Sequence, residues 1–146
     1  MKVGRWKVEF PVRVPSVPFR GEFLMDLPHR EITEQIIGAA FEVHGVLGYG
    51  FLEKVYQRAM QEELRLRGVN AEAECPITVV YKGTIIGEYR ADLFVENVVI
   101  VELKVAREYQ PADEPQLLNE LRATRVKVGM LINFGRTKVE FKRLVF

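Results

Sequence analysis

The sequence predicts an α/β (α+β) domain in which helices flank one central mixed β-sheet, in the element order ααβββαββ. Two observations indicate this class. Apolar residues recur at helical spacing through residues 31–67, whereas beyond Pro76 they alternate with a period of two. One further helical pattern, at about 113–124, lies between the later strands, as in a domain with helices packed on a single sheet.

The two helices near the start have clear ends. The first covers about residues 31–46 and stops at the glycines of "GVLGYG", which break the helical pattern. The second covers about residues 51–67 and stops at Gly68, a residue suited to the left-handed position that follows a helix.

The strands and the third helix follow. "ITVVY" and "IIGEYRADLFV" form a hairpin around the glycine of "KGT", and a turn at Glu96 and Asn97 leads into "VVIVELKV". Asp113 is a suitable N-cap for a helix through about Thr124. "RVKVGMLINF" and "TKVEFKRLVF" read as the last two strands.

The chain divides into an arm and a domain. Residues 1–28 are proline-rich at their start and read as an extended arm or an extra edge strand, with "RWKVEF" as its short strand. Residues 29–146 form the domain, and Met25 is an alternative start of the native chain.

Composition narrows the class of protein. A single cysteine, Cys75, excludes an intramolecular disulfide and a cysteine-based zinc site. No apolar run has the length of a membrane span and no signal peptide is evident, so we expect a cytoplasmic protein without a membrane partner.

The net charge is only +1, which argues against a protein that coats nucleic acid. However, residues 122–146 hold seven Lys or Arg against Glu140 alone, and the middle of the chain is acidic. A basic rim beside a metal pocket and an ordinary mixed-charge surface both account for this pattern, and charge alone favours the latter.

The strand "NVVIVELKV" carries two charges on one face, Glu102 and Lys104. Burying a charge is costly unless it is paired or bound to an ion. A two-residue turn at Glu96 and Asn97 would send Asp92 and Glu102 to opposite faces, whereas a three-residue loop that includes Val98 would place the two carboxylates opposite each other. In the second register, a shared Mg²⁺ or Mn²⁺ would relieve their repulsion.

Asp92, Glu102 and Lys104 at this spacing resemble the PD-(D/E)XK nuclease superfamily. "GFLEKVY", "DLFVENVVIVELK", "QLL" and "GMLINFG" are similar to the blocks of its GxxExxY branch, in the same order and from about Ile32 to the end of the chain. The resemblance implies a restriction-endonuclease-like core. The chain departs from the family pattern in two places: Tyr49 replaces a usual proline, and Glu120 stands where the QxxxY motif has its tyrosine.

The resemblance also implies roles. Asp92, Glu102 and the carbonyl of Leu103 would hold Mg²⁺, or else Mn²⁺, and Lys104 would position or deprotonate the attacking water. Glu53 matches a helix-borne acid near the metal, and Gln116 matches the glutamine of QxxxY. The implied function is a metal-dependent nuclease that hydrolyses phosphodiester bonds of DNA, with RNA as the less favoured alternative, by a metal-activated water. Because a chain of 146 residues has little surface for sequence-specific recognition, we expect it to act as a homodimer or with a protein partner.

Plainer explanations stay open for each residue. Lys104 could simply pair with Glu102, Arg90 could be the counter-ion of Asp92, and Glu53 could serve the dipole of its helix. We expect Tyr56 to be a core residue with a hydrogen-bonded hydroxyl and His44 to be a packed histidine. The alternative function is a catalytically silent module of the same fold that binds nucleic acid or a protein partner.

Overall fold

The computed structural model describes residues 27–146, and its first helices match the helical patterns closely. α2 runs from Arg30–Leu47 and α3 from Glu53–Leu66. Gly68 has a φ of +75° just beyond α3, and the N–H groups of Gly68 and Val69 donate to the carbonyls of Arg65 and Leu64. This Schellman arrangement confirms the predicted end of the helix.

The rest of the chain supplies five strands and one more helix. Their bounds are β1 (Ala71–Tyr81), β2 (Thr84–Val95), β3 (Val99–Lys104), α4 (Glu114–Thr124), β4 (Val128–Phe134) and β5 (Val139–Val145), with a short 3-10 helix, η1 (Pro111–Asp113), leading into α4. β1 therefore begins six residues before the "ITVVY" segment that predicted it, so Cys75 lies within the strand and not at its start. Asp113 occupies the N-cap position of α4, but its side chain makes no capping hydrogen bond.

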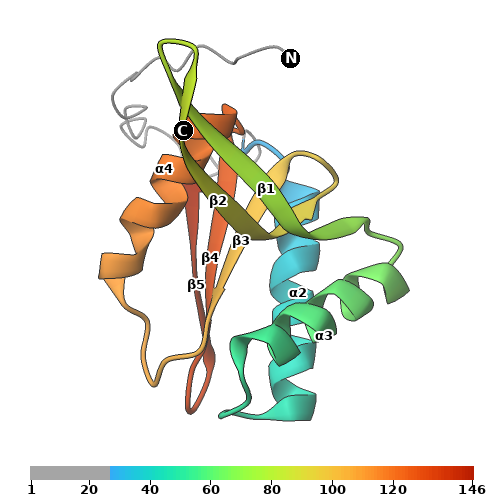
Figure 1. The fold of residues 1–146 in the computed structure, drawn as a ribbon. Helices are drawn as coiled ribbons and strands as arrows, with labels where there is room; N and C mark the ends of the chain where they lie inside the picture. Colours follow the sequence, from blue (N-terminus) through green and yellow to red (C-terminus); the bar gives the residue numbers. More distant parts are fainter. Residues whose placement is uncertain (1–26) are drawn as a thin grey trace, which may run out of the picture.

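The five strands form a single mixed sheet in the order β1-β2-β3-β4-β5. Only β3 and β4 run parallel, and the other neighbours are antiparallel. α2 and α3 cover one face of the sheet and α4 covers the other (Figure 1). The predicted α+β class with a mixed central sheet is confirmed, and the layers explain why β4, paired on both sides and covered on both faces, is buried throughout and apolar except at Asn133.

The hairpin of β1 and β2 bends sharply at Asp92. Leu93 packs with α2 and α3, whereas Ala91, two residues away, packs with α4. On a flat strand these two side chains would share a face, because residues two apart point to the same side. Glu74, between the residues of β1 that pair with Ala91 and Leu93, has a φ of +57° and marks the bend.

The predictions made for residues 1–28, including the strand at "RWKVEF", concern a segment that lies almost wholly outside the described residues, and the proposed boundary at residue 28 stays a prediction. From residue 27 onward, no helix is long and apolar enough to cross a membrane.

Candidate functional site

A three-residue loop between β2 and β3 sets the register of the site. Val95 pairs with Val99 and Leu93 with Val101, so the next position in this register places Asp92 opposite Glu102. Asn97 adopts the left-handed conformation that this loop requires, with a φ of +56°, and Glu96 does so too. The register that brings the two carboxylates together is therefore confirmed, and the two-residue turn is excluded.

Where β2 and β3 separate, hydrogen bonds between side chains and backbone replace those between the two backbones. The N–H of Leu103 donates to Asp92 Oδ2 at 2.7 Å, and the N–H of Asp92 lies 3.4 Å from Glu102 Oε1. Gln57 Nε2 donates to the carbonyl of Asp92 at 2.8 Å. Each acid is thus held by the backbone of the opposite strand, and α3 holds the backbone of β2 from the other side.

Glu102 is a buried acid, with 3% of its surface exposed. Burial raises the pKa of Glu102 to about 11, and a hydrogen bond with Glu120 and the charge of Asp92 act in the same direction. A carboxyl group in this environment holds its proton unless a cation takes the place of that proton.

Glu120 extends the acidic group from the far side, because α4 places its carboxylate beside Glu102. Only 1% of Glu120 is exposed, and burial raises its pKa although hydrogen bonds from Glu102 and Gln116 oppose the shift. Gln116 Nε2 donates to Oε1 at 3.2 Å, while Oε2 has no hydrogen-bond partner among residues 27–146. The sequence identified Glu120 only as a departure from a motif, whereas the structure brings it to the site, with Gln116 attached through it.

Lys104 does not neutralise Glu102. No ion pair or hydrogen bond involves the Lys104 ammonium group within the described part of the chain. The positive charge of Lys104 acts on Glu53 and Glu120, lowering the pKa of each against a larger effect of burial. The simple explanation of a Glu102–Lys104 ion pair is therefore wrong, and Lys104 has its ammonium group available for another partner.

Glu53 begins α3 at the same place. Partial burial raises its pKa, Lys104 lowers it and Asp92 raises it, so its carboxylate senses both charges of the site. Arg90 is not the counter-ion of Asp92 that the sequence allowed. It forms no ion pair with Asp92, and its charge lowers the pKa of Glu74 instead. The structure thus groups Glu53 with the acidic pair and leaves Arg90 outside the group.

The donor atoms at this position suit a hard divalent cation. In a strand, the N–H and C=O of a residue point to the same side, so the Leu103 carbonyl faces the side on which its N–H meets Asp92. Two carboxylates and a carbonyl oxygen are ligands that Mg²⁺ and Mn²⁺ prefer. Over residues 27–146, no three acidic, histidine or cysteine side chains approach closely enough to form a protein-only metal cage. The residues fit a cation that keeps several positions for water and substrate.

The tyrosine of "GFLEKVY" and the histidine of α2 have structural roles, as predicted. Tyr56 is fully buried, stacks on Phe134 at 4.5 Å between ring centroids, and donates from its hydroxyl to the carbonyl of Gly48 at 2.5 Å. His44 Nε2 lies 2.7 Å from the carbonyl oxygen of Gly135. The Tyr56 contact ties the loop before α3 to the helix that begins with Glu53, and the His44 contact joins α2 to the loop after β4.

Gln57 is a site residue that sequence reasoning missed. It lies one helical turn after Glu53, is 4% exposed, and contacts β2 through the Asp92 carbonyl. The sequence could have indicated this role, because Gln57 lies next to Tyr56 on the side of α3 that we expected to be buried. A buried amide needs a hydrogen-bond partner.

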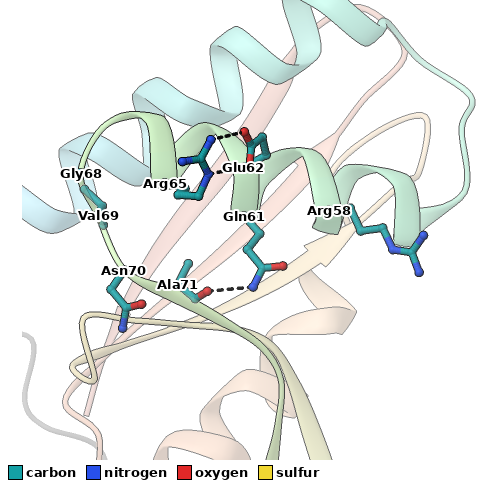
Figure 2. Close-up of a pocket in the computed structure, with 8 residues that line it drawn as sticks. All are labelled: Arg58, Gln61, Glu62, Arg65, Gly68, Val69, Asn70 and Ala71. Carbon is teal, nitrogen blue, oxygen red and sulfur yellow. Dashed lines mark hydrogen bonds and ion pairs between the residues drawn. The ribbon is translucent and has the colours of Figure 1, made fainter.

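A groove of about 460 Å³ lies elsewhere, between α3 and the start of β1 (Figure 2). Three of its polar side chains already have partners, since Arg65 pairs with Glu62 at 2.7 Å and Gln61 Nε2 donates to the carbonyl of Ala71 at 3.0 Å. Arg58 points away from these residues. This groove contains none of the acids of the site, and we assign it no function.

Comparisons with known proteins agree with this geometry. The family model described as the PD-(D/E)XK nuclease superfamily matches residues 30–144. The crystal structure of SSO0001 is similar, with a TM-score of 0.53 and 18% identity over 79% of this chain, a likeness of fold. The match spans 57% of the SSO0001 chain. No curated protein matches the sequence.

Proposed function

Because the chain belongs to the PD-(D/E)XK nuclease superfamily, we propose that Asp92, Glu102 and Lys104 form the active centre of a metal-dependent nuclease. Its substrate is DNA in preference to RNA, and its metal is Mg²⁺, with Mn²⁺ as the alternative. Nucleases of this superfamily generally use divalent metals and bind nucleic acid. The single observation that carries the proposal is the pair of opposed carboxylates, Asp92 and buried Glu102, beside a lysine without an ion-pair partner among the described residues.

The first role is to hold the cation. Asp92, Glu102 and the Leu103 carbonyl would supply three oxygen ligands on one side and leave the other side open. A bound divalent cation neutralises phosphate charge and lowers the pKa of water near it. The two strands keep the carboxylates in place because each accepts a hydrogen bond from the opposite strand.

Lys104 has the second role. Its ammonium group follows Glu102 on the same face of β3 and would bind a phosphate oxygen, stabilising the negative charge that develops during attack by water. Glu53, whose raised pKa favours proton uptake, would orient that water from the start of α3. Gln116 would contact the substrate strand or hold Glu120 away from it.

We place the chain in the GxxExxY branch on the motifs "GFLEKVY" and "QLL".

The test is a titration of wild-type protein, Glu102→Gln and the control Glu31→Gln with Mg²⁺ and Mn²⁺ by calorimetry. Labelled single-stranded and double-stranded DNA, with RNA for comparison, report cleavage. We expect the wild type and the control to bind metal and cleave DNA, and Glu102→Gln to do neither. The proposal is wrong if the wild type binds no metal, or if Glu102→Gln cleaves as fast as the wild type.

A second candidate is a binding module that keeps the fold without turnover. Glu120 favours it, because this buried acid occupies the position of the QxxxY tyrosine and adds a negative charge beside Glu102. Metal binding without cleavage of either nucleic acid, together with retention of DNA or a second copy of the chain in a sedimentation experiment, would support this function.

A further inference from the structure

Two arginines gather at the edge of the sheet where β3 and β4 end. The two strands are parallel neighbours, so Lys104 and Asn133 lie side by side near their C-terminal ends. The loops that follow carry Arg107 and Arg136, and they enclose a groove of about 540 Å³. Its lining consists of Arg107, Glu108, Gln110, Arg136 and Thr137.

The backbone around this groove is held firmly. Arg136 N–H donates to the Arg107 carbonyl at 3.3 Å, which joins the two loops directly. Asn133 makes a pair of 2.9 Å hydrogen bonds with the N–H and carbonyl of Ala106. A Cβ atom on Gly135 would lie 2.6 Å from the Lys138 carbonyl and 3.3 Å from that of Arg107. The loops therefore approach as closely as a glycine allows. The backbone of both arginines is held in place, and their side chains extend from fixed Cα positions.

The side chains suit an anion. Neither the Arg107 nor the Arg136 guanidinium has a hydrogen-bond or ion-pair partner among residues 27–146. Thr137 and Gln110 add a hydroxyl and an amide, and Glu108 is the single acid in the lining. The planar guanidinium group binds phosphate through two parallel hydrogen bonds, so two arginines without partners on one groove are typical of a phosphate site.

The groove is also close to the acidic pair along the chain. Arg107 follows Lys104 by three residues, which separates their Cα atoms by at most about 11 Å. Phosphates of one strand of B-DNA are spaced about 3.4 Å apart along the helix axis and further apart through space, so this reach covers at most about three nucleotides.

We propose that Arg107 and Arg136 form a second phosphate site, which binds the nucleic-acid backbone a few nucleotides from the bond that is cleaved. This inference rests on the proposed function for the identity of its ligand. The site fixes the register of the strand and supplies affinity without reading the base sequence.

The first experiment measures DNA affinity. A fluorescein-labelled 20-nucleotide DNA, single-stranded or duplex, is titrated with full-length protein at several salt concentrations, in the presence of Ca²⁺ to limit cleavage. The variants are Arg107→Gln/Arg136→Gln and the control Arg58→Gln/Lys127→Gln, which removes the same charge from positions outside the groove. We expect the groove variant to bind about tenfold more weakly and to lose about 1.5 from its salt slope, since each phosphate contact contributes about 0.7–0.9.

Glu108→Gln tests the same site in the opposite direction, because removing the one acid of the lining should tighten DNA binding about two- to threefold. Circular dichroism checks that all variants are folded. If the groove variant and the control lose affinity equally, the arginine site is wrong, while DNA binding by the wild type keeps the proposed function standing.

A second experiment separates the two proposals. Inorganic phosphate or pyrophosphate is added to ¹⁵N-labelled wild-type protein, and the Nε–H signals of the arginines are followed by NMR. We expect Arg107 and Arg136 to shift and Arg58 to stay. Shifts of this kind in a protein that binds no DNA or RNA would support the anion site and overturn the proposed function, whereas unshifted Arg107 and Arg136 signals would overturn the site.

Discussion

Asp92 and Glu102 lie opposite each other at the point where β2 and β3 part, and each accepts a hydrogen bond from the strand of the other. The contact from Leu103 N–H to Asp92 Oδ2 is short, at 2.7 Å, whereas that from Asp92 N–H to Glu102 Oε1 is 3.4 Å. Asp92 is therefore fixed firmly, and Glu102 is held mainly by burial and by Glu120. Two acids in this relation repel each other unless a proton or a cation lies between them.

We expect Glu102→Gln to stabilise the protein in the presence of a chelator, by about 1–3 kcal/mol at pH 7, because the buried acid must otherwise take up a proton on folding. Urea denaturation of wild type and variant measures the difference. Saturating Mg²⁺ should stabilise the wild type and leave the variant unchanged. A variant less stable than the chelated wild type would show that the Glu102 carboxylate is a favourable structural group.

The stability of the chelated wild type should fall as the pH rises from about 5 to 8. The folded-state pKa of Glu102, about 11, lies above its unfolded value, so the folded state binds the proton more tightly. That stabilisation is complete below pH about 4.5 and is lost as the pH rises. The expected slope approaches about 1.4 kcal/mol per pH unit, measured from urea midpoints, and it should be much flatter in Glu102→Gln. Stability that increases over this range would contradict the prediction.

Glu120→Gln should raise the stability of the metal-free protein by about 1 kcal/mol, since it removes a buried acid that is repelled by the charge of Asp92 and lets the new amide donate to Glu102. Thermal unfolding measures the change. Glu62→Gln, which alters an exposed acid paired with Arg65, serves as the control and should leave the stability close to that of the wild type. Loss of stability in Glu120→Gln alone would mean that the unpartnered Oε2 accepts a hydrogen bond in solution.

Asn133→Ala should cost about 2–3 kcal/mol. The amide of this buried residue satisfies both backbone groups of Ala106, and without it a donor and an acceptor are left unpaired in a partly buried position. Urea denaturation is compared with Asn119→Ala on the exposed side of α4, which should be nearly neutral. Equal effects of the two substitutions would argue against a special role for the Asn133–Ala106 pair.

Gly135→Ala should destabilise the protein by about 1–3 kcal/mol, because the new methyl group meets two backbone carbonyls. Gly45→Ala is the matched control: a Cβ atom at that position of α2 has nothing within 4 Å, and alanine favours a helix over glycine by about 1 kcal/mol. The two variants should therefore change the melting temperature in opposite directions. A neutral Gly135→Ala would show that the two loops can separate at little cost.

The sequence predicted the fold through local rules. The periodicity of apolar residues located α2 and α3 to within two residues, and Gly68 gave the end of α3. The loop at Glu96–Val98 narrowed the register of β2 and β3 to two possibilities. The start of β1 was placed too late because its first four residues are alternating Ala and Glu, which have low β-propensity. Their pairing with β2, and not their own residue types, makes them a strand.

By itself, the sequence determined the elements of the domain and the presence of Asp92, Glu102 and Lys104 on two adjoining strands. The tertiary structure decided which other groups join them. Gln57 and Glu120 reach the site from helices on opposite faces of the sheet, and Arg107 meets Arg136 only because β3 and β4 end at the same edge. Such contacts depend on packing between segments far apart in the chain, and on the bend at Glu74 and Asp92, whereas periodicity describes only neighbours along one element.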